Sequence, residues 1–107
     1  MEHQSVEWKQ SWRDEYLKWI CAFANTQGGI IIIGKDDTGV VVGVDDAAKL
    51  LEDLPNKIRN ALGIVASVNL ESENGKPYIS IEVSYYDFPV SYHTVNTMSV
   101  PAARRRN

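Results

Sequence analysis

The sequence has 107 residues, the length of a single domain, and its 44% hydrophobic and 23% charged residues exclude a disordered chain. Eleven Lys and Arg residues against fourteen Asp and Glu residues give a formal charge of −3, so bulk charge gives no support to nucleic-acid binding. The lone Cys21 excludes an internal disulfide and a cysteine-built zinc site. The apolar runs are too short to cross a membrane and no signal-peptide pattern opens the chain, so we expect a cytoplasmic protein without a membrane partner.

The first half of the chain indicates an extended piece, a helix and a hairpin. Residues 5–8 can be extended, and Trp12, Tyr16, Trp19, Ile20 and Phe23 recur at the spacing of an amphipathic helix of about 14 residues. The glycines of 25–29 favour the end of that helix. The β-branched run 30–33 predicts a strand covered on both faces, and 34–39 predicts a turn that returns the chain as a strand at 40–42.

The second half indicates another helix and a second hairpin. Asp45 or Asp46 can begin a helix, which we expect Pro55 to break before the apolar stripe resumes at Ile58 and Leu62. Residues 65–70 predict a strand, and Asn74-Gly75 is the strongest short-range hairpin signal in the chain. Residues 78–85 alternate apolar and polar side chains, so one face of that strand should be exposed.

This order of elements predicts an α+β fold. We expect a twisted, mostly antiparallel sheet of about four to six strands, with two or three helices packed on one face. A sheet of this kind has unpaired edges, and an unpaired edge favours a homodimer or another protein–protein contact.

Four stretches carry a recognisable combination of motifs. Residues 2–9 have Glu, four residues, Glu, an aromatic residue and Lys, and residues 22–29 read Ala-Phe-Ala-Asn-Thr-Gln-Gly-Gly. A glycine-marked hairpin follows at 31–44, and Gly-Lys-Pro precedes an alternating strand, as in a closing hairpin, that runs to Pro89. Together they resemble the Schlafen-type AlbA-like domain, a DNA-binding domain at the N-terminus of many bacterial transcriptional regulators. The resemblance covers residues 2 to about 92.

The end of the chain departs from the family pattern, which continues into an aromatic-rich strand ending in Arg-x-Gly-Ser. Back-translation of 94–107 in a shifted frame gives Gly-Lys-Tyr-Tyr-Val-Arg-Ala-Gly-Ser-Thr-Thr-Gln-Glu, which resembles that strand. We therefore expect an AlbA-like domain at 1–92 and a non-family tail at 93–107, either frameshifted or disordered. The three arginines near the end are then no evidence for a nucleic-acid site.

The resemblance implies a candidate metal site of three carboxylates. Some members of the family act as RNA endonucleases, and by position their acidic residues fall on Glu2, Glu7 and Asp37. Three such oxygen ligands could hold Mg²⁺ or Mn²⁺ and activate water against a phosphodiester. The alternative is a solvated terminus and an ordinary turn aspartate. Without this chemistry no cofactor is expected.

Two further groups are candidate nucleic-acid contacts. Residues 25–27 (Asn25, Thr26 and Gln27) can line a binding site, or they can serve only as a helix end and turn. The basic residues Lys9, Arg13, Lys18 and Lys35 can hold phosphates, or they can be solvated surface. We expect the amino-terminal carboxylates, Asn25 and the 36–37 bend to converge on one surface.

The resemblance implies a module that binds DNA or RNA, mainly through phosphates, as the N-terminal part of a bacterial transcriptional regulator. A metal-dependent endoribonuclease is the second interpretation, and a protein-interaction or dimerisation module is the third. Net charge disfavours the first, and an open sheet edge favours the third.

Overall fold

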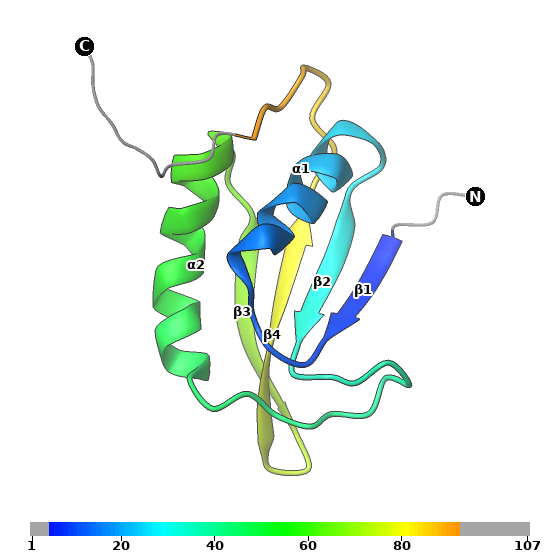
Figure 1. The fold of residues 1–107 in the computed structure, drawn as a ribbon, viewed down its shortest axis with the longest axis vertical. Helices are drawn as coiled ribbons and strands as arrows, with labels where there is room; N and C mark the ends of the chain where they lie inside the picture. The colour runs from blue at the N-terminus through cyan, green and yellow to red at the C-terminus, as the bar shows by residue number, and fades with distance from the viewer. Residues whose placement is uncertain (1–4, 93–107) are drawn as a thin grey trace.

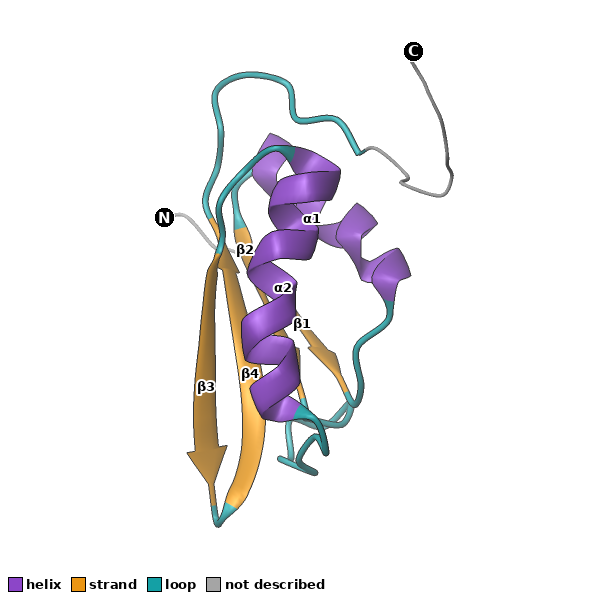
Figure 2. Cartoon of the chain, turned by 90° about the vertical axis from the view of Figure 1, so that its left-hand side faces the viewer, coloured by secondary structure: helices purple, strands orange, loops and turns teal. Residues whose placement is uncertain are grey.

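A computed structural model describes residues 5–92 of the chain. Four strands form one sheet in the order β1-β2-β4-β3 (Figure 1). They are β1 (Ser5–Lys9), β2 (Gly29–Ile33), β3 (Ser67–Glu73) and β4 (Lys76–Val83). β1 runs parallel to β2, and the other two pairings are antiparallel. Both α-helices lie on the same face of the sheet (Figure 2), so the α+β prediction, with its mostly antiparallel sheet, is confirmed.

The first helix is shorter than its apolar spacing predicts. A turn of 3-10 helix at Asp14–Tyr16 (η1) leads into α1 at Leu17–Asn25. Trp12 stays outside the helix because its indole nitrogen donates to the Asp14 carboxylate at 2.7 Å and its ring meets the Tyr16 ring edge-on. Trp12 and Tyr16 still pack against the core, so the periodicity predicted the buried stripe but not where the helix begins.

The hairpin predicted for 30–33 and 40–42 is wrong. β2 pairs with β1 along one edge and with β4 along the other, so neither edge is free for a third strand. The returning chain makes only one isolated bridge, between Lys35 and Val41. The turn itself is present, because an Asp36 carboxylate oxygen accepts hydrogen bonds from the backbone and hydroxyl of Thr38 and from the backbone of Val40.

The second helix runs through its proline. α2 spans Ala47–Leu62 without interruption and ends at Gly63, whose φ of 71° is in the left-handed region. The break predicted at Pro55 is therefore wrong. Leu54 and Ile58 on either side of the proline are fully buried, and this continuous apolar stripe outweighs the hydrogen bond that the proline removes.

The β3–β4 hairpin has the predicted two-residue turn. Asn74 and Gly75 both have positive φ, 55° and 77°, and Glu73 pairs with Lys76 across the turn. This is the conformation that a type I′ turn requires, which is why Asn-Gly favours it. The alternation along β4 is confirmed for its apolar face, since Ile79, Ile81 and Val83 are buried. The opposite face is exposed at Glu82, but Ser80 on that face is buried, so the prediction of an exposed face is only partly right.

The core lies between the sheet and the helices. Alternate residues of β2 and β4 point into it and meet the apolar stripes of α1 and α2; its largest fully buried side chains are Ile20, Ile31, Ile33, Leu54, Ile58, Ile79, Ile81 and Val83. The opposite face of β2 carries Ile30 and Ile32, which are only half-buried. The prediction that 30–33 is covered on both faces is therefore wrong, and cross-strand neighbours Val6 and Trp8 take the place of a covering helix.

Among the described helices, neither has the length and apolar character to cross a membrane. The tail at 93–107 and Glu2 lie outside the described residues.

Candidate nucleic-acid interface

The backbones of two of the predicted basic residues meet where β1 and β2 end. Lys9 is the last residue of β1, and Lys35 follows β2 by two positions. The Lys9 carbonyl accepts hydrogen bonds from the backbone nitrogens of Gly34 at 2.6 Å and Lys35 at 3.2 Å. Parallel pairing places the ends of both strands at the same end of the sheet, so the backbone itself makes the two lysines neighbours.

Each of these lysines lies over aromatic rings. The Lys9 ammonium is 5.1 Å from the centre of the Tyr16 ring and 5.3 Å from that of Trp19. The Lys35 ammonium is 5.2 Å from the centre of the Tyr78 ring. Ring faces attract cations without neutralising them, so both side chains are oriented while their charge remains available to an anion.

Arg13 and Lys18 belong to the segment that follows β1. Arg13 precedes η1, is exposed, and lies 4.0 Å from the Glu15 carboxylate, which is also exposed. Lys18 is exposed near the start of α1. Within residues 5–92, neither Lys18 nor the two strand-end lysines, Lys9 and Lys35, has a carboxylate oxygen within 4.0 Å. Among the described residues, Lys9, Lys18 and Lys35 are therefore cations without a carboxylate partner, whereas Arg13 lies beside Glu15.

Asn25 has a structural role at the opposite end of β2. Its side-chain nitrogen donates to the Val90 carbonyl at 2.9 Å, and its side-chain oxygen accepts from the Val90 backbone nitrogen at 2.8 Å. The Cys21 thiol donates to the same carbonyl at 3.2 Å, and burial raises the pKa of Cys21 above its ordinary value. Asn25 thus ties the segment after β4 to the end of α1.

Thr26 and Gln27 lie beside Asn25, away from the lysines. The Thr26 hydroxyl donates to the Ala22 carbonyl at 2.8 Å, and Gln27 is exposed. β2 separates 25–27 from the 36–37 bend, one before the strand begins and the other after it ends (Figure 1). The structure therefore does not bring Asn25 and the bend onto one surface, and the candidate interface reduces to the strand-end residues.

The described carboxylates do not form a metal site. Glu7 is half-buried in the middle of β1, opposite Ile31, and Asp37 is exposed in the turn. The neighbouring Asp36 is occupied by Thr38 and Val40, and these hydrogen bonds lower the pKa of its carboxyl. Within the described part of the chain, no three His, Cys, Asp or Glu residues lie close enough to share a metal ion. Glu7 and Asp37 by themselves do not make such a site, and the three-carboxylate set stays a prediction because Glu2 lies outside the described residues.

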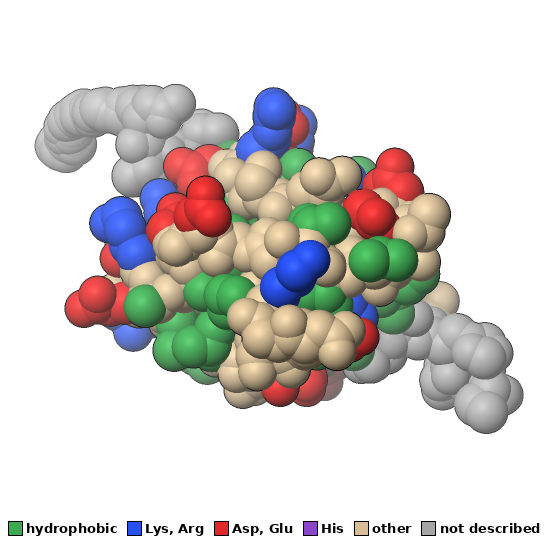
Figure 3. All heavy atoms as spheres, turned by 90° about the horizontal axis from the view of Figure 1, so that it is seen from below, with side chains coloured by type: hydrophobic (Ala, Val, Ile, Leu, Met, Phe, Trp, Pro, Cys, Tyr) green, Lys and Arg blue, Asp and Glu red, His purple; other side chains and the backbone are tan. Residues whose placement is uncertain are grey.

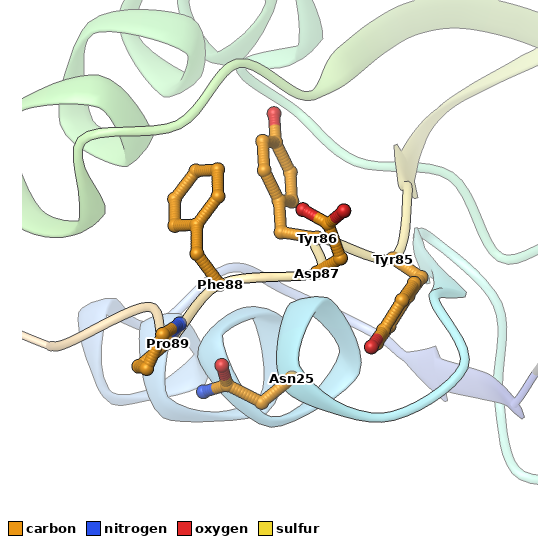
Figure 4. Close-up of a pocket in the computed structure, with 6 residues that line it drawn as sticks. All are labelled: Asn25, Tyr85, Tyr86, Asp87, Phe88 and Pro89. Carbon is orange, nitrogen blue, oxygen red and sulfur yellow. The ribbon is translucent and has the colours of Figure 1, made fainter.

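The segment after β4 forms a small hollow that sequence reasoning missed. Its volume is about 310 Å³, and Figure 4 shows its lining of Asn25, Tyr85, Tyr86, Asp87, Phe88 and Pro89. The Tyr86 hydroxyl donates to the Val65 carbonyl at 3.1 Å and accepts from its backbone nitrogen at 3.2 Å. In the sequence, the three aromatic residues within 85–88 were the feature that could have predicted a segment packed against the rest of the domain.

Charges are mixed on the lower face of the molecule. Figure 3 shows Lys and Arg side chains interspersed with Asp and Glu and with green hydrophobic areas, rather than gathered into one basic surface. An anion would therefore contact a few separate cations and not a broad positive field.

Comparison with known proteins identifies the family and the fold. The family model described as Schlafen, AlbA_2 matches residues 2–107. The matched range includes 93–107, so a domain end near residue 92 stays a prediction. No curated protein matches the chain.

Two solved structures have a similar fold. One is the N-terminal domain of an ATP-dependent DNA helicase RecG-related protein from Nitrosomonas europaea, with a TM-score of 0.69 and 24% identity, covering 100% of this chain and 82% of that one. The other is the DIP2311 protein from Corynebacterium diphtheriae, with a TM-score of 0.65 and 23% identity. That match covers 81% of this chain but only 19% of the DIP2311 chain.

Proposed function

This chain belongs to the Schlafen AlbA_2 family, and on that premise we propose that it binds nucleic acid through phosphates, as the DNA-binding module of a bacterial transcriptional regulator. The observation that carries the proposal is the pair of strand-end lysines, Lys9 and Lys35, which are joined through the backbone and have no carboxylate partner in the described chain. The similar fold in a DNA helicase RecG-related protein supports association with nucleic acid.

The contacts expected from this arrangement are few and directed at the backbone of the nucleic acid. Lys9 and Lys35 would act as point charges, and Arg13 could bind a phosphate with two donors at once. Each neutralised phosphate lowers the slope of log affinity against log salt by about 0.9, so three contacts predict a slope of about −3. The overall charge of −3 opposes any wider electrostatic attraction, so the binding should be weak at high ionic strength.

Fluorescence anisotropy with labelled DNA duplex, DNA single strand and RNA, each titrated with salt, tests the proposal. We expect Lys35→Ala to weaken binding and to make the salt slope shallower by about 1. Lys49→Ala is the matched control, because it removes the same charge from α2, where Lys49 is paired with Asp53 at 3.0 Å. Equal losses in both variants, or no binding by the unaltered chain at low salt, would contradict the proposal.

A further inference from the structure

Among residues 5–92, β1 is an edge strand, and its free edge has a definite hydrogen-bonding pattern. The Lys9 carbonyl faces β2, because it accepts a hydrogen bond from the Gly34 nitrogen. Backbone groups of successive residues in a strand point to alternate sides. The N–H and C=O groups of Val6 and Trp8 therefore face away from β2, toward the open edge of the sheet.

The side chains of this edge are apolar on one face and charged on the other. Val6 is 49% exposed and Trp8 is 38% exposed, on the face without helices. Glu7 and Lys9 lie on the helix-covered face, in register with Ile31 and Ile33. The other edge of the sheet, β3, ends in Glu71 and Glu73, which would repel a second copy of the same strand.

We propose that β1 pairs antiparallel with β1 of a second copy of this chain, around a two-fold axis that passes beside Trp8. In this register Trp8 lies opposite Trp8 of the other copy, and Glu7 lies opposite Lys9. The outward backbone groups of the two Trp8 residues bond each other directly. The Glu7–Lys9 positions are then non-hydrogen-bonded pairs, in which facing side chains are closest. The axis is perpendicular to the sheet, so the helices of both copies stay on the same face.

Charge selects this register over its neighbours. The backbone groups on the open edge of β1 could also pair if the two-fold axis passed beside Glu7 or beside Lys9. The first places Glu7 opposite Glu7, and the second places Lys9 opposite Lys9; both juxtapose like charges, which is destabilising. The Trp8-centred register is the one that forms opposite-charge pairs, and it forms two of them because of the two-fold symmetry.

Lys9 is already positioned for this contact. Its ammonium lies over the Tyr16 and Trp19 rings, at 5.1 and 5.3 Å, and within residues 5–92 it has no carboxylate within 4.0 Å. An ion pair formed there would cost little side-chain entropy because the lysine is held before the partner arrives. The ammonium has three donors, so it can also contact a phosphate.

Charge reversal tests the pairing. Sedimentation of the full chain over about 10 µM to 1 mM should show a concentration-dependent dimer, since an interface of one strand edge is small. Glu7→Lys and Lys9→Glu should each weaken the dimer at least tenfold, and the double variant should restore it. Glu71→Lys, on the other edge, is the control and should leave the dimer unchanged. A monomer at every concentration, or a double variant as weak as the singles while still folded by circular dichroism, would overturn the proposal.

Disulfide trapping tests the register itself, in a Cys21→Ser background. Directly opposed residues in a hydrogen-bonded pair are about 5.5 Å apart at Cα, within the range of a disulfide, so Trp8→Cys should form a covalent dimer on oxidation. Val6→Cys should not, because its two copies would be four positions apart, about 13 Å. The reverse pattern would contradict the register. Neither experiment contains nucleic acid, so its failure is distinguishable from a failure of the proposed function.

Discussion

The amide of Asn25 holds the segment after β4 against the end of α1. It does so with two hydrogen bonds to one residue, Val90, which lies 65 positions further along the chain. An amide side chain is suited to this because it offers a donor and an acceptor side by side. These two hydrogen bonds give Asn25 a role in holding the fold together, and that role does not require a bound ligand.

Replacing Asn25 should destabilise the chain. Asn25→Ala removes both hydrogen bonds and leaves a part-buried backbone N–H without its partner, so we expect a loss of about 1–3 kcal/mol in the free energy of unfolding. Urea denaturation measures this. Gln27→Ala, at an exposed neighbour, should change the free energy by less than about 0.5 kcal/mol. Equal effects at the two positions would show that the Val90 contact does not stabilise the fold.

Asp36 makes the stability of the bend depend on pH. The Thr38 hydroxyl and then the Val40 backbone lower the pKa of its carboxyl below the ordinary 3.8. The unfolded chain therefore binds the proton more tightly than the folded chain. The stabilising contribution of Asp36 is fully present above pH 4 or so, and it is lost as pH falls through the lower, folded pKa.

An NMR titration of the Asp36 carboxyl carbon checks this assignment. We expect its pKa in the folded chain to be below 3.8, and Thr38→Val to move it upward because that variant removes the largest cause of the shift. Asp36→Asn should remove the corresponding part of the acid dependence of unfolding. An unchanged Asp36 pKa in Thr38→Val would contradict the assigned cause.

At the scale of elements, α2 shows that burial can override a local signal. Pro55 lies inside the helix with no N–H to donate, yet Leu50, Leu54 and Ile58 keep one buried face across it. Most helical stability in proteins comes from packing of such a face, not from intrinsic propensity.

Removing the proline should therefore stabilise α2. Pro55→Ala restores a backbone donor inside the helix and replaces the worst helix former with the best, so we expect the free energy of unfolding to rise by about 1–3 kcal/mol. Thermal denaturation followed by circular dichroism measures it. Asn60→Ala, at an exposed position of the same helix, should give no more than about 0.7 kcal/mol. A loss of stability in Pro55→Ala would mean that the packing of the proline ring contributes more than its missing hydrogen bond and poor helix propensity cost.

On the scale of the whole molecule, the sheet has two unequal edges, and the helices of the described part of the chain leave one of its faces uncovered (Figure 2). The β3 edge carries the acidic residues Glu71 and Glu73, which discourage pairing. The β1 edge carries exposed apolar residues and a self-complementary Glu7–Lys9 pattern. Under the proposed pairing, this asymmetry would direct association to the β1 side of the sheet, and the strand-end cations remain the candidate surface for nucleic acid.

Much of the fold could be read from local patterns. The Asn74-Gly75 hairpin, the alternation of β4, the second apolar helix and the α+β class all depend on signals a few residues apart. The candidate site was predicted less well. The backbones of Lys9 and Lys35 meet at the strand ends, and their role in binding stays a prediction. Asn25 lies elsewhere, because β2 separates the motif before the strand from the turn after it.

The sequence by itself determined most of the helices and strands and the Asn74-Gly75 turn, since periodicity and turn chemistry act over short spans of chain, and its motifs indicated the family. Only the tertiary structure decided that 40–42 stays outside the sheet, that Pro55 is tolerated and that Asn25 is a clamp. Each of these depends on which distant segment occupies a shared edge or face in the folded chain. A strand can pair along only two edges, and the core has room for a limited set of side chains. Segments far apart in the chain therefore compete for the same places, and local sequence does not show which of them occupies each one.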